Sequence, residues 1–482
     1  MKRIFALTLA ILILALTLAG CDNENVNTGD KPVVNEKEEV VFDDTLKLAY
    51  SKNDSLNPLE CKTQLNSQLL TLVFEGLFTL SDNYEPKPAV ALEGIVSGNV
   101  VNVTLGSAKF SDGSNVTADD VLKSFFAAKE SPVYSTRLSN FLNAVKANEN
   151  MIMFSLEKPD PFALSCLDFP VVRKKTDSSF SLGTGKYYFL KNKENTYLAL
   201  NTYKSGFEPK YKTIKLVSVY DSDSIESSIV IGDTAFYYND ISDGEYSRIN
   251  AHTVDVGLNS LVFLGVNTKF GMLSDSVFRN AVNKCIDREK IVSSAFRSHA
   301  RVTYTPYNPD WYALGSQSFF FSRNLKDINE YLKENERELK SGQLTFMYCK
   351  DNPFKAETAE IIIDNLKKLG FIVNVKAYSR EAFDYDLAIG SYDLYLGEIK
   401  LTNNMDLSVL LGDEANLSRQ RYDEYLEGKC QLIDFINTFN EDVAFIPLCY
   451  RNALVSYTNS LSAKFKCNEN NLFEDIDSWS MG

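Results

Sequence analysis

The chain has 482 residues, of which 44% are hydrophobic and 24% charged, and its formal net charge is -14. A chain of this length and apolar content is predicted to fold into roughly two or three lobes instead of remaining disordered. A nucleic-acid groove needs clustered Lys and Arg, so the acidic balance argues against nucleic acid as a partner. It is typical of an acidic surface that keeps a protein soluble.

The N-terminus has the pattern of an export signal. Lys2 and Arg3 precede an apolar run, Ile4 to Ala19, that is short for a membrane span but suits a signal peptide. The run ends in Leu18-Ala19-Gly20-Cys21, which resembles a bacterial lipobox. The resemblance implies cleavage before Cys21 and acylation of that cysteine, which would anchor the chain in the membrane. A plain signal peptide with an incidental Cys21 is the alternative.

The segment after Cys21 is predicted to be a flexible tether. Residues 22–40 are polar and contain no aromatic residue, so they cannot bury enough surface to fold. No later run reaches the 18 or so apolar residues of a transmembrane helix. We therefore expect the remainder of the chain to lie outside the membrane.

The cysteines and histidines of the sequence form no metal-binding or catalytic motif. Apart from Cys21 there are seven cysteines, without metal-like or redox spacing, and we predict buried thiols, with one or two disulfides as the alternative. The only histidines, His252 and His299, lie in no motif. We therefore predict no cofactor, no metal site and no enzymatic activity.

The first half of the mature chain contains strands, a turn and two helices. Residues 45–50 alternate like a strand, residues 64–74 read as a helix, and residues 100–110 as a second strand. Ser111-Asp112-Gly113 supplies a tight turn. Thr117 is a predicted N-cap, because its hydroxyl can accept the amide hydrogen three residues on, ahead of Asp119 and Asp120.

The second half has alternating strands and helices. Residues 261–267 are predicted to form a strand, followed by helices that begin at Ser276 and Asp287. A strand at 344–349, a helix at 355–369 and a strand at 371–377 predict a βαβ unit with a parallel crossover. Asp393 to Gly397 is a further predicted strand.

The order of these segments resembles the family 5 extracellular solute-binding proteins, the peptide, dipeptide and nickel receptors of ABC importers. The most specific match is Phe110-Ser111-Asp112-Gly113 followed by the helix that Thr117 caps. Further matches are Phe74-Glu75-Gly76-Leu77, Gly183-Thr184-Gly185-Lys186-Tyr187 and Ile286-Asp287-Arg288. The resemblance covers nearly all of the chain from Thr45 onward.

This resemblance implies an α/β fold of the large periplasmic-binding-protein type, with mixed sheets in two lobes joined by a hinge. The implied division is residues 1–20 as signal peptide, 21–44 as lipidated cysteine and tether, 45–63 with 181–258 and 448–482 as the core of lobe I, 64–180 as an extra subdomain of lobe I, and 259–447 as lobe II.

The implied ligand pocket departs from the pattern of peptide-binding relatives. There, the strand like 393–397 leads to a tryptophan and then to an aspartate that holds the peptide's ammonium group. Here Glu398 takes the tryptophan position and Leu401 falls near the aspartate position. A buried ammonium needs a carboxylate partner. Either Glu398 or Asp406 replaces the aspartate, or the ligand is not a conventional peptide.

Candidate ligand-binding residues come from this segment and from positions where relatives bring side chains to the cleft. For each of them a core position or an exposed loop position is the alternative. They are Tyr50, Asn57, Trp311, Tyr312, Glu398, Lys400, Asn403, Asn404 and Asp406.

The function implied by the resemblance is that of a monomeric, lipid-anchored receptor outside the cytoplasm, on the bacterial cell membrane. It would close its lobes around an oligopeptide and present it to an ABC permease. A receptor for a nickel chelate or an oligosaccharide is one alternative, and a sensory or adhesive surface lipoprotein is another.

Overall fold

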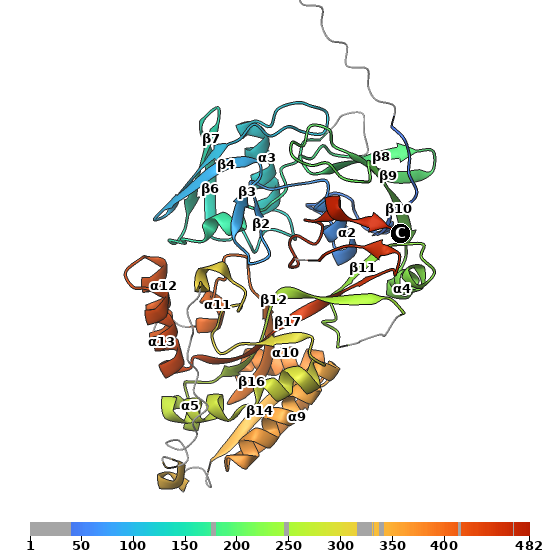
Figure 1. Ribbon diagram of the computed structural model, residues 1–482. Helices are drawn as coiled ribbons and strands as arrows, with labels where there is room; N and C mark the ends of the chain where they lie inside the picture. The colour runs from blue at the N-terminus through green and yellow to red at the C-terminus, as the bar shows by residue number, and fades with distance from the viewer. Residues whose placement is uncertain are drawn as a thin grey trace, which may run out of the picture. The chain divides into compact units, whose positions relative to one another are not determined.

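Three sheets of four or more strands organise the part of the chain that the computed structural model describes (Figure 1). It describes residues 40–174, 180–244, 250–315, 330, 332–336, 342–412, 416–465 and 467–482. The predicted signal peptide, Cys21 and nearly all of the tether lie outside these residues. Residues 41–482 form one compact unit.

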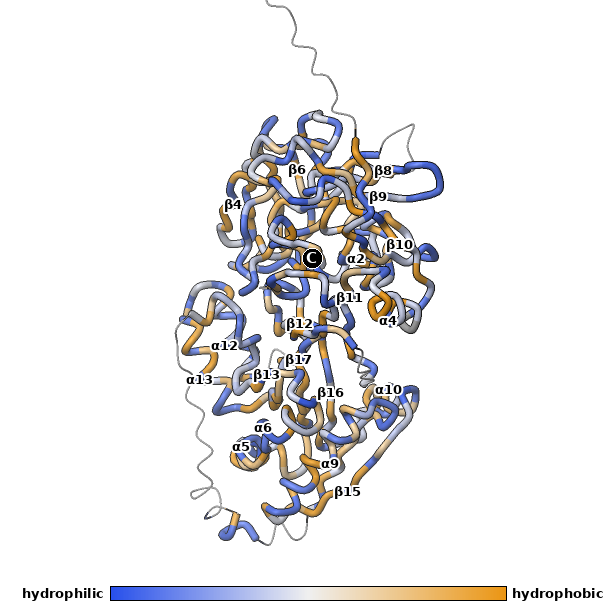
Figure 2. The backbone as a smooth tube through the Cα atoms, turned by 45° about the vertical axis from the view of Figure 1, so that its right-hand side comes forward, coloured by the Kyte–Doolittle hydropathy of each residue, from blue (hydrophilic) through white to orange (hydrophobic). Residues whose placement is uncertain are grey.

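The first sheet has the order β1-β10-β9-β8, and its strands contribute to one hydrophobic core, which we call the lobe I core after the predicted division. The parallel pair β1 and β10 places Lys47 opposite Lys215, and the other pairs are antiparallel. The turn between β8 and β9 is hydrophilic, as expected for a hairpin that ends in solvent (Figure 2). The elements are β1 (Lys47–Ser51), α2 (Gln64–Leu70), β8 (Tyr187–Asn192), β9 (Asn195–Leu200), β10 (Thr213–Val219), α4 (Ser222–Val230) and β11 (Phe236–Asn239).

Helix α2 is shorter than the predicted helix over residues 64–74. It begins after Thr63, whose side chain caps it, and ends at Leu70. The backbone of Leu72 and Val73 pairs instead with the start of β8, since Leu72 O accepts from Tyr187 N and Val73 O accepts from Gly185 N, both at 2.9 Å. Gly185 permits this approach, because a Cβ there would lie 2.5 Å from Leu72 O.

The second sheet, with the order β4-β5-β7-β6, belongs to the lobe I subdomain. Helix α3 packs on it through Phe125, whose ring lies 5.2 Å from that of Phe154. The predicted N-cap is confirmed, because Thr117 and Asp120 form a reciprocal capping box. The elements are β2 (Phe78–Leu80), β3 (Pro86–Pro88), β4 (Ala91–Ser97), β5 (Val100–Leu105), α3 (Ala118–Lys129), β6 (Phe141–Asn148), β7 (Met151–Leu156) and η1 (Ala163–Cys166).

The third sheet is the largest, with the order β11-β17-β12-β16-β14-β15 and β13 paired to β17. Strands β14 and β15 are parallel and joined by α9, so the predicted βαβ unit is confirmed. Besides β11 (Phe236–Asn239), its strands are β12 (His252–Val266), β13 (Ala300–Val302), β14 (Gln343–Cys349), β15 (Ile372–Tyr378), β16 (Leu394–Lys400) and β17 (Phe445–Tyr457).

Helices α9 and α10 pack on strands β14 and β15 of this sheet, and further helices and two short strands complete the described elements. The helices are η2 (Met272–Ser274), α5 (Ser276–Cys285), α6 (Arg288–Lys290), the π-helical η3 (Ile291–Ala295), η4 (Tyr312–Leu314), α9 (Pro353–Lys368), α10 (Arg380–Ile389), α11 (Ser408–Leu411), α12 (Leu417–Leu426) and α13 (Leu432–Asp442). The C-terminal elements are β18 (Leu461–Ser462), η5 (Ile476–Ser478) and β19 (Ser480–Met481).

Strands β12 and β17 run side by side and contribute to two hydrophobic cores (Figure 1). Val256 and Leu258 pack in the lobe I core, whereas Val262 and Leu264 pack in a lobe II core. The register of the pair shifts between Gly257 and Leu261, at the change from one core to the other. These strands therefore join the lobes. The exact division predicted from the sequence stays a prediction.

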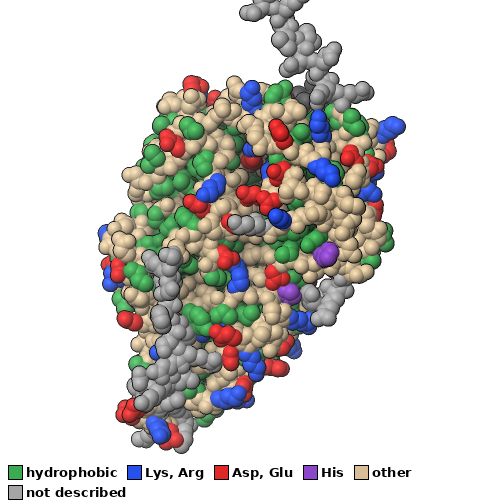
Figure 3. All heavy atoms as spheres, viewed as in Figure 1, with side chains coloured by type: hydrophobic (Ala, Val, Ile, Leu, Met, Phe, Trp, Pro, Cys, Tyr) green, Lys and Arg blue, Asp and Glu red, His purple; other side chains and the backbone are tan. Residues whose placement is uncertain are grey.

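The cysteines that the structure describes form no disulfide. Five of the seven are buried, as predicted for thiols that pack as small apolar residues. Charged side chains of both signs are interspersed over the face of the described residues that Figure 3 shows.

Candidate functional site

The segment after β16 carries three of the predicted ligand-binding residues, Asn403, Asn404 and Asp406, and we call residues 401–407 the β16–α11 loop. Leu401 is buried, and Met405 takes a positive φ of 58° in a turn closed by its amide and Thr402 O, 2.9 Å apart. The Asn259 side chain donates to Leu401 O at 3.1 Å and to Thr402 O at 3.0 Å. The loop is thus fixed to strand β12.

Two asparagines of this loop contact the lobe I subdomain. Asn403 Nδ2 donates to Asp168 Oδ2 at 2.9 Å, and Asn404 Nδ2 donates to Asp160 Oδ2 at 2.8 Å. Both aspartates flank η1. The loop of lobe II is therefore hydrogen-bonded to lobe I at two adjacent positions.

A cavity of about 800 Å³ lies beside this contact, and we call it the interlobe cavity. Its walls come from subdomain residues between 139 and 160 and from lobe II residues between 404 and 427. Its lining contains one basic side chain, Lys158, and six acidic ones, which are Glu157, Asp160, Asp406, Asp423, Glu424 and Glu427. A cavity with this lining is suited to a positively charged ligand.

Two carboxylates in this cavity have distinct environments. Burial raises the pKa of Asp160 to about 6 and the nearby Asp406 adds to the rise, although the hydrogen bonds from Asn404 and the Phe162 amide oppose it. Asp406 Oδ1 accepts from the Ser408 amide at 2.9 Å and from Tyr422 OH at 3.1 Å. Its Oδ2 has no hydrogen-bond partner among the described residues. A cation placed here would stabilise both charged forms.

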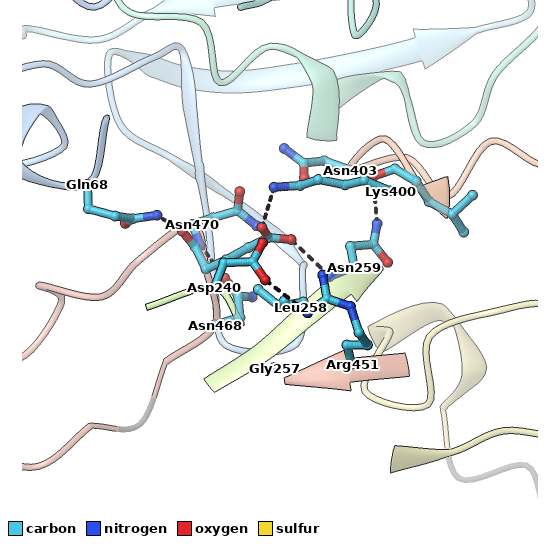
Figure 4. Close-up of polar contacts among 12 residues, drawn as sticks. Gln68, Asp240, Gly257, Leu258, Asn259, Lys400, Asn403, Arg451, Asn468 and Asn470 are labelled. Carbon is cyan, nitrogen blue, oxygen red and sulfur yellow. Dashed lines mark hydrogen bonds and ion pairs between the residues drawn. The ribbon is translucent and has the colours of Figure 1, made fainter. Parts of the chain in front are cut away.

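Glu398 is compensated by two cations. It pairs with Arg451 Nε and, at 3.2 Å, with Lys355 Nζ. Arg451 is 3% exposed and also binds Asp240 Oδ1 at 2.9 Å, and Figure 4 shows these two side chains pointing toward each other. Glu398 therefore differs from Asp406, to which no cation is paired among the described residues. The sequence did not distinguish these two carboxylates.

Lys400 pairs with Glu469 of the C-terminal segment. Glu469 is buried, and its Oε1 also accepts from the Asn259 amide at 2.9 Å. Lys400 is the last residue of β16, the strand that also carries Glu398, so this ion pair joins the end of that strand to lobe I.

The remaining predicted residues do not line the interlobe cavity. Trp311 is 2% exposed and packs against Phe162, 4.7 Å between ring centroids, while the Tyr312 amide donates to Asn83 O at 2.9 Å. Tyr50 packs against the lobe I core, and Asn57 Oδ1 accepts from the Leu59 amide at 3.2 Å. Their roles in ligand binding stay predictions.

Asp160 and Asp168 were missed by the sequence analysis. Asp160 lies 244 positions before its partner Asn404, so no local pattern links them. The one available signal is the segment Pro159-Asp160-Pro161, because two prolines restrict the backbone around a single carboxylate.

A second cavity, of about 280 Å³, is lined only by lobe I residues, and we call it the lobe I cavity. It lies among helix α2, residues 133–137, Asp168 and residues 469–474. Among the described residues, no group of three or more His, Cys, Asp or Glu side chains is placed to hold a metal ion.

Two lobes of α/β structure, joined by a pair of long strands, define the class of periplasmic-binding-protein-like receptors. The profile of the bacterial extracellular solute-binding proteins, family 5, matches residues 85–410. The chain belongs to this family. Because the family consists of solute-binding receptors, the chain is a receptor and no enzyme, as predicted.

Known proteins similar to the chain include one from Bacillus subtilis strain 168, the oligopeptide-binding protein AppA. It is 24% identical over 306 residues, a match that spans 56% of this chain and 56% of AppA. The MppA periplasmic murein tripeptide binding protein, in its unliganded open form, has a TM-score of 0.73 and 17% identity, covering 92% of this chain and 98% of MppA. NikZ from Campylobacter jejuni, in complex with Ni(L-His), has a TM-score of 0.60 and 20% identity, covering 91% of this chain and all of NikZ.

These structures confirm the predicted two-lobed fold. No helix among the described residues is both long enough and apolar enough to span a membrane.

Proposed function

We propose that the chain is the substrate-binding receptor of an ABC importer and that it captures oligopeptides with a free N-terminus in the interlobe cavity. The observation that carries the proposal is Asp406, an uncompensated carboxylate in an acidic cavity that both lobes line. A peptide ammonium placed between Asp406 and Asp160 would compensate charges that the described side chains leave unmatched.

Hinge closure would couple this binding to transport. A ligand held by residues of both lobes makes more contacts in the closed state than in the open state, so it shifts the equilibrium toward closure. The register shift in β12 and β17 lies where the two cores meet, and is the natural place for bending. A volume of about 800 Å³ suits a ligand of several residues.

The similarity to AppA supports an oligopeptide as the ligand, although the match covers only about half of that protein. A positively charged metal chelate is the second candidate, because the acidic cavity would suit it too and NikZ is described in complex with Ni(L-His). Anchoring through acylated Cys21 is part of the proposal. It predicts that a labelled fatty acid is incorporated into the parent chain and not into a Cys21→Ser variant, and a parent chain without label would contradict the anchor.

Tryptophan emission tests the ligand class. Trp311 contacts Phe162, two residues from Asp160, so its emission reports on the wall of the interlobe cavity. The purified full chain is titrated with a pool of short peptides, then with the same pool N-acetylated, and with Ni(L-His). We expect saturable binding of the free peptides with Kd near 1 μM, corresponding to about -8 kcal/mol, and loss of binding on acetylation.

Charge-removing variants identify the anchor. Asp406→Asn should weaken peptide binding by about 2 kcal/mol, roughly 30-fold, because the ammonium loses a partly buried charged partner. Glu398→Gln and the exposed control Glu357→Gln should bind within about threefold of the parent. Loss of binding in Glu398→Gln alone would reassign the anchor to Glu398. A response only to Ni(L-His) would reject the peptide and leave the receptor role.

A further inference from the structure

The lobe I cavity is built differently from the interlobe cavity. All of its lining residues precede position 187 or follow position 468, so lobe II contributes none. It is bounded by helix α2, Arg137, Asp168 and the C-terminal segment at Asn470. Binding of a ligand in this cavity therefore does not require the two lobes to close on each other.

Three polar atoms in the walls of this cavity are shielded from solvent and have no hydrogen-bond partner among the described residues. They are Gln68 Oε1, Asp168 Oδ1 and Asn470 Nδ2. Buried polar groups are nearly always hydrogen-bonded, so three unmatched atoms around one cavity indicate a place where partners arrive from outside the chain.

The geometry of Gln68 strengthens this argument. The residue is only 7% exposed, and its Nε2 donates to Glu469 O at 2.8 Å, which fixes the side-chain amide. Figure 4 shows Gln68 reaching toward Asn470. With Nε2 held, Oε1 remains an acceptor that needs a donor.

The charged side chains at the cavity also differ in how many of their polar atoms have hydrogen-bond partners. Arg137 pairs with Asp168 through Nη1, and its guanidinium lies over the ring of Tyr134, 5.2 Å from the ring centroid, while Nε and Nη2 have no hydrogen-bond partner among the described residues. Lys186 Nζ donates to the carbonyls of Phe473 and Glu474, at 3.0 and 2.6 Å. By contrast, Glu75 at the rim has both oxygens engaged by a lysine, at 2.6 Å each.

These unmatched groups define a complementary ligand. Two acceptors, one of them a carboxylate oxygen, need an ammonium group, whereas an unused guanidinium edge binds a carboxylate. The volume of about 280 Å³ admits a molecule the size of one amino acid. An apolar ligand would leave all of these groups unpaired.

We propose that the lobe I cavity is a second binding site, for an amino-acid-sized molecule that carries both an ammonium and a carboxylate group. Its sources are a free amino acid or the terminal residue of a bound peptide. Asp168 links the site to the β16–α11 loop, because its Oδ2 accepts from Asn403. The site stands apart from the interlobe cavity and does not depend on the proposed peptide anchor.

Titration calorimetry of the full chain with an equimolar mixture of the twenty standard amino acids, then with each alone, tests the proposal. We expect saturable binding that weakens at least about tenfold when the ligand is N-acetylated or amidated, since each change removes one charged partner. Binding of peptides that weakens in the Gln68→Met variant, without binding of any free amino acid, would assign the site to a peptide terminus. If neither amino acid binding nor peptide binding weakens in the Gln68→Met and Arg137→Lys variants, no ligand binds in this cavity and the proposal is overturned.

Variants locate the binding. Gln68→Met keeps the side-chain length but removes the acceptor, and should weaken binding at least about tenfold. Gln64→Met, one turn earlier in α2 at a position whose side chain is exposed and does not line the cavity, is the matched control and should leave binding unchanged. Arg137→Lys keeps the charge but loses the planar fork, so we expect weaker binding with the fold retained. If that variant fails to fold, Gln68→Met decides.

The Asp406→Asn variant separates this proposal from the receptor function. Amino acid binding should persist in it. Loss of amino acid binding in Asp406→Asn but not in Gln68→Met would place the ligand in the interlobe cavity and overturn the second site. If the parent chain binds amino acids but no peptide, the proposed peptide ligand is refuted and the second site is not.

Discussion

Replacement of Asp160 by asparagine should stabilise the chain at neutral and alkaline pH. The side chain is buried, at 5% exposure, and its pKa is raised from the ordinary value of 3.8 to about 6. The unfolded chain releases this proton near pH 4, whereas the folded chain holds it until about pH 6. Asp160 therefore lowers the stability of the parent as the pH rises from about 4 to 6, and the penalty remains at higher pH.

The size of the effect follows from the shift. About two pKa units at 1.4 kcal/mol each correspond to about 3 kcal/mol of destabilisation above pH 6. Asparagine removes that charge but loses one acceptor, and losing the hydrogen bond from Asn404 costs about 1 kcal/mol. We expect Asp160→Asn to be about 2 kcal/mol more stable than the parent at pH 8, and about 1 kcal/mol less stable at pH 3.

Urea unfolding measures this difference at both pH values. In a Trp479→Phe background the emission comes from Trp311, which packs against Phe162 near the mutated site. Asp119→Asn, an exposed carboxylate on α3, is the control and should stay within about 0.5 kcal/mol of the parent. A stability difference of the same sign at pH 3 and pH 8, or a destabilised Asp160→Asn at pH 8, would refute the reasoning.

Three further variants test the packing that positions the site, each by its urea midpoint. Arg451→Gln leaves two carboxylates without their buried cation and should cost about 3 to 5 kcal/mol, whereas Arg380→Gln, in an exposed pair, should cost less than about 1 kcal/mol. Equal midpoints for these two would contradict the buried network. Gly183→Ala should lower the free energy of unfolding by about 2 kcal/mol or more, because its Cβ would lie 2.1 Å from a backbone carbonyl oxygen. In Gly98→Ala the Cβ meets nothing within 4 Å, so the cost should be about 1 kcal/mol, which comes from the φ of +56°. Thr117→Ala should cost about 1 kcal/mol through loss of the α3 cap, and an unchanged midpoint would show that the capping box adds nothing.

Structural features that depend only on residues close together in the sequence could be predicted. The Thr117 cap depends on a residue three positions away, and the βαβ unit depends on hydrophobic periodicity within some thirty residues. Helix α2 marks the limit of this approach. Its apolar pattern continues past Leu70, but tertiary pairing of Leu72 and Val73 with the strand near Tyr187 ends the helix.

The site depends on contacts between distant residues, so its details could not be predicted. Spacing alone gave Glu398 and Asp406 equal standing as substitutes for the usual aspartate. The structure distinguishes them through Arg451 and Lys355, which lie 53 and 43 positions from Glu398. Asp160 offers no periodic pattern at all, since its partner lies in the other lobe.

The C-terminal segment that closes the lobe I core sets the order in which the chain can fold. Trp479 and Phe473 belong to the same hydrophobic core as Leu48 of β1, so this early strand finds part of its core only in residues that are made more than 400 positions later. Lobe I therefore cannot complete its packing until the segment that contains Phe473 and Trp479 has been made. For a chain with a predicted export signal, this delay would keep the polypeptide unfolded until it reaches the far side of the membrane.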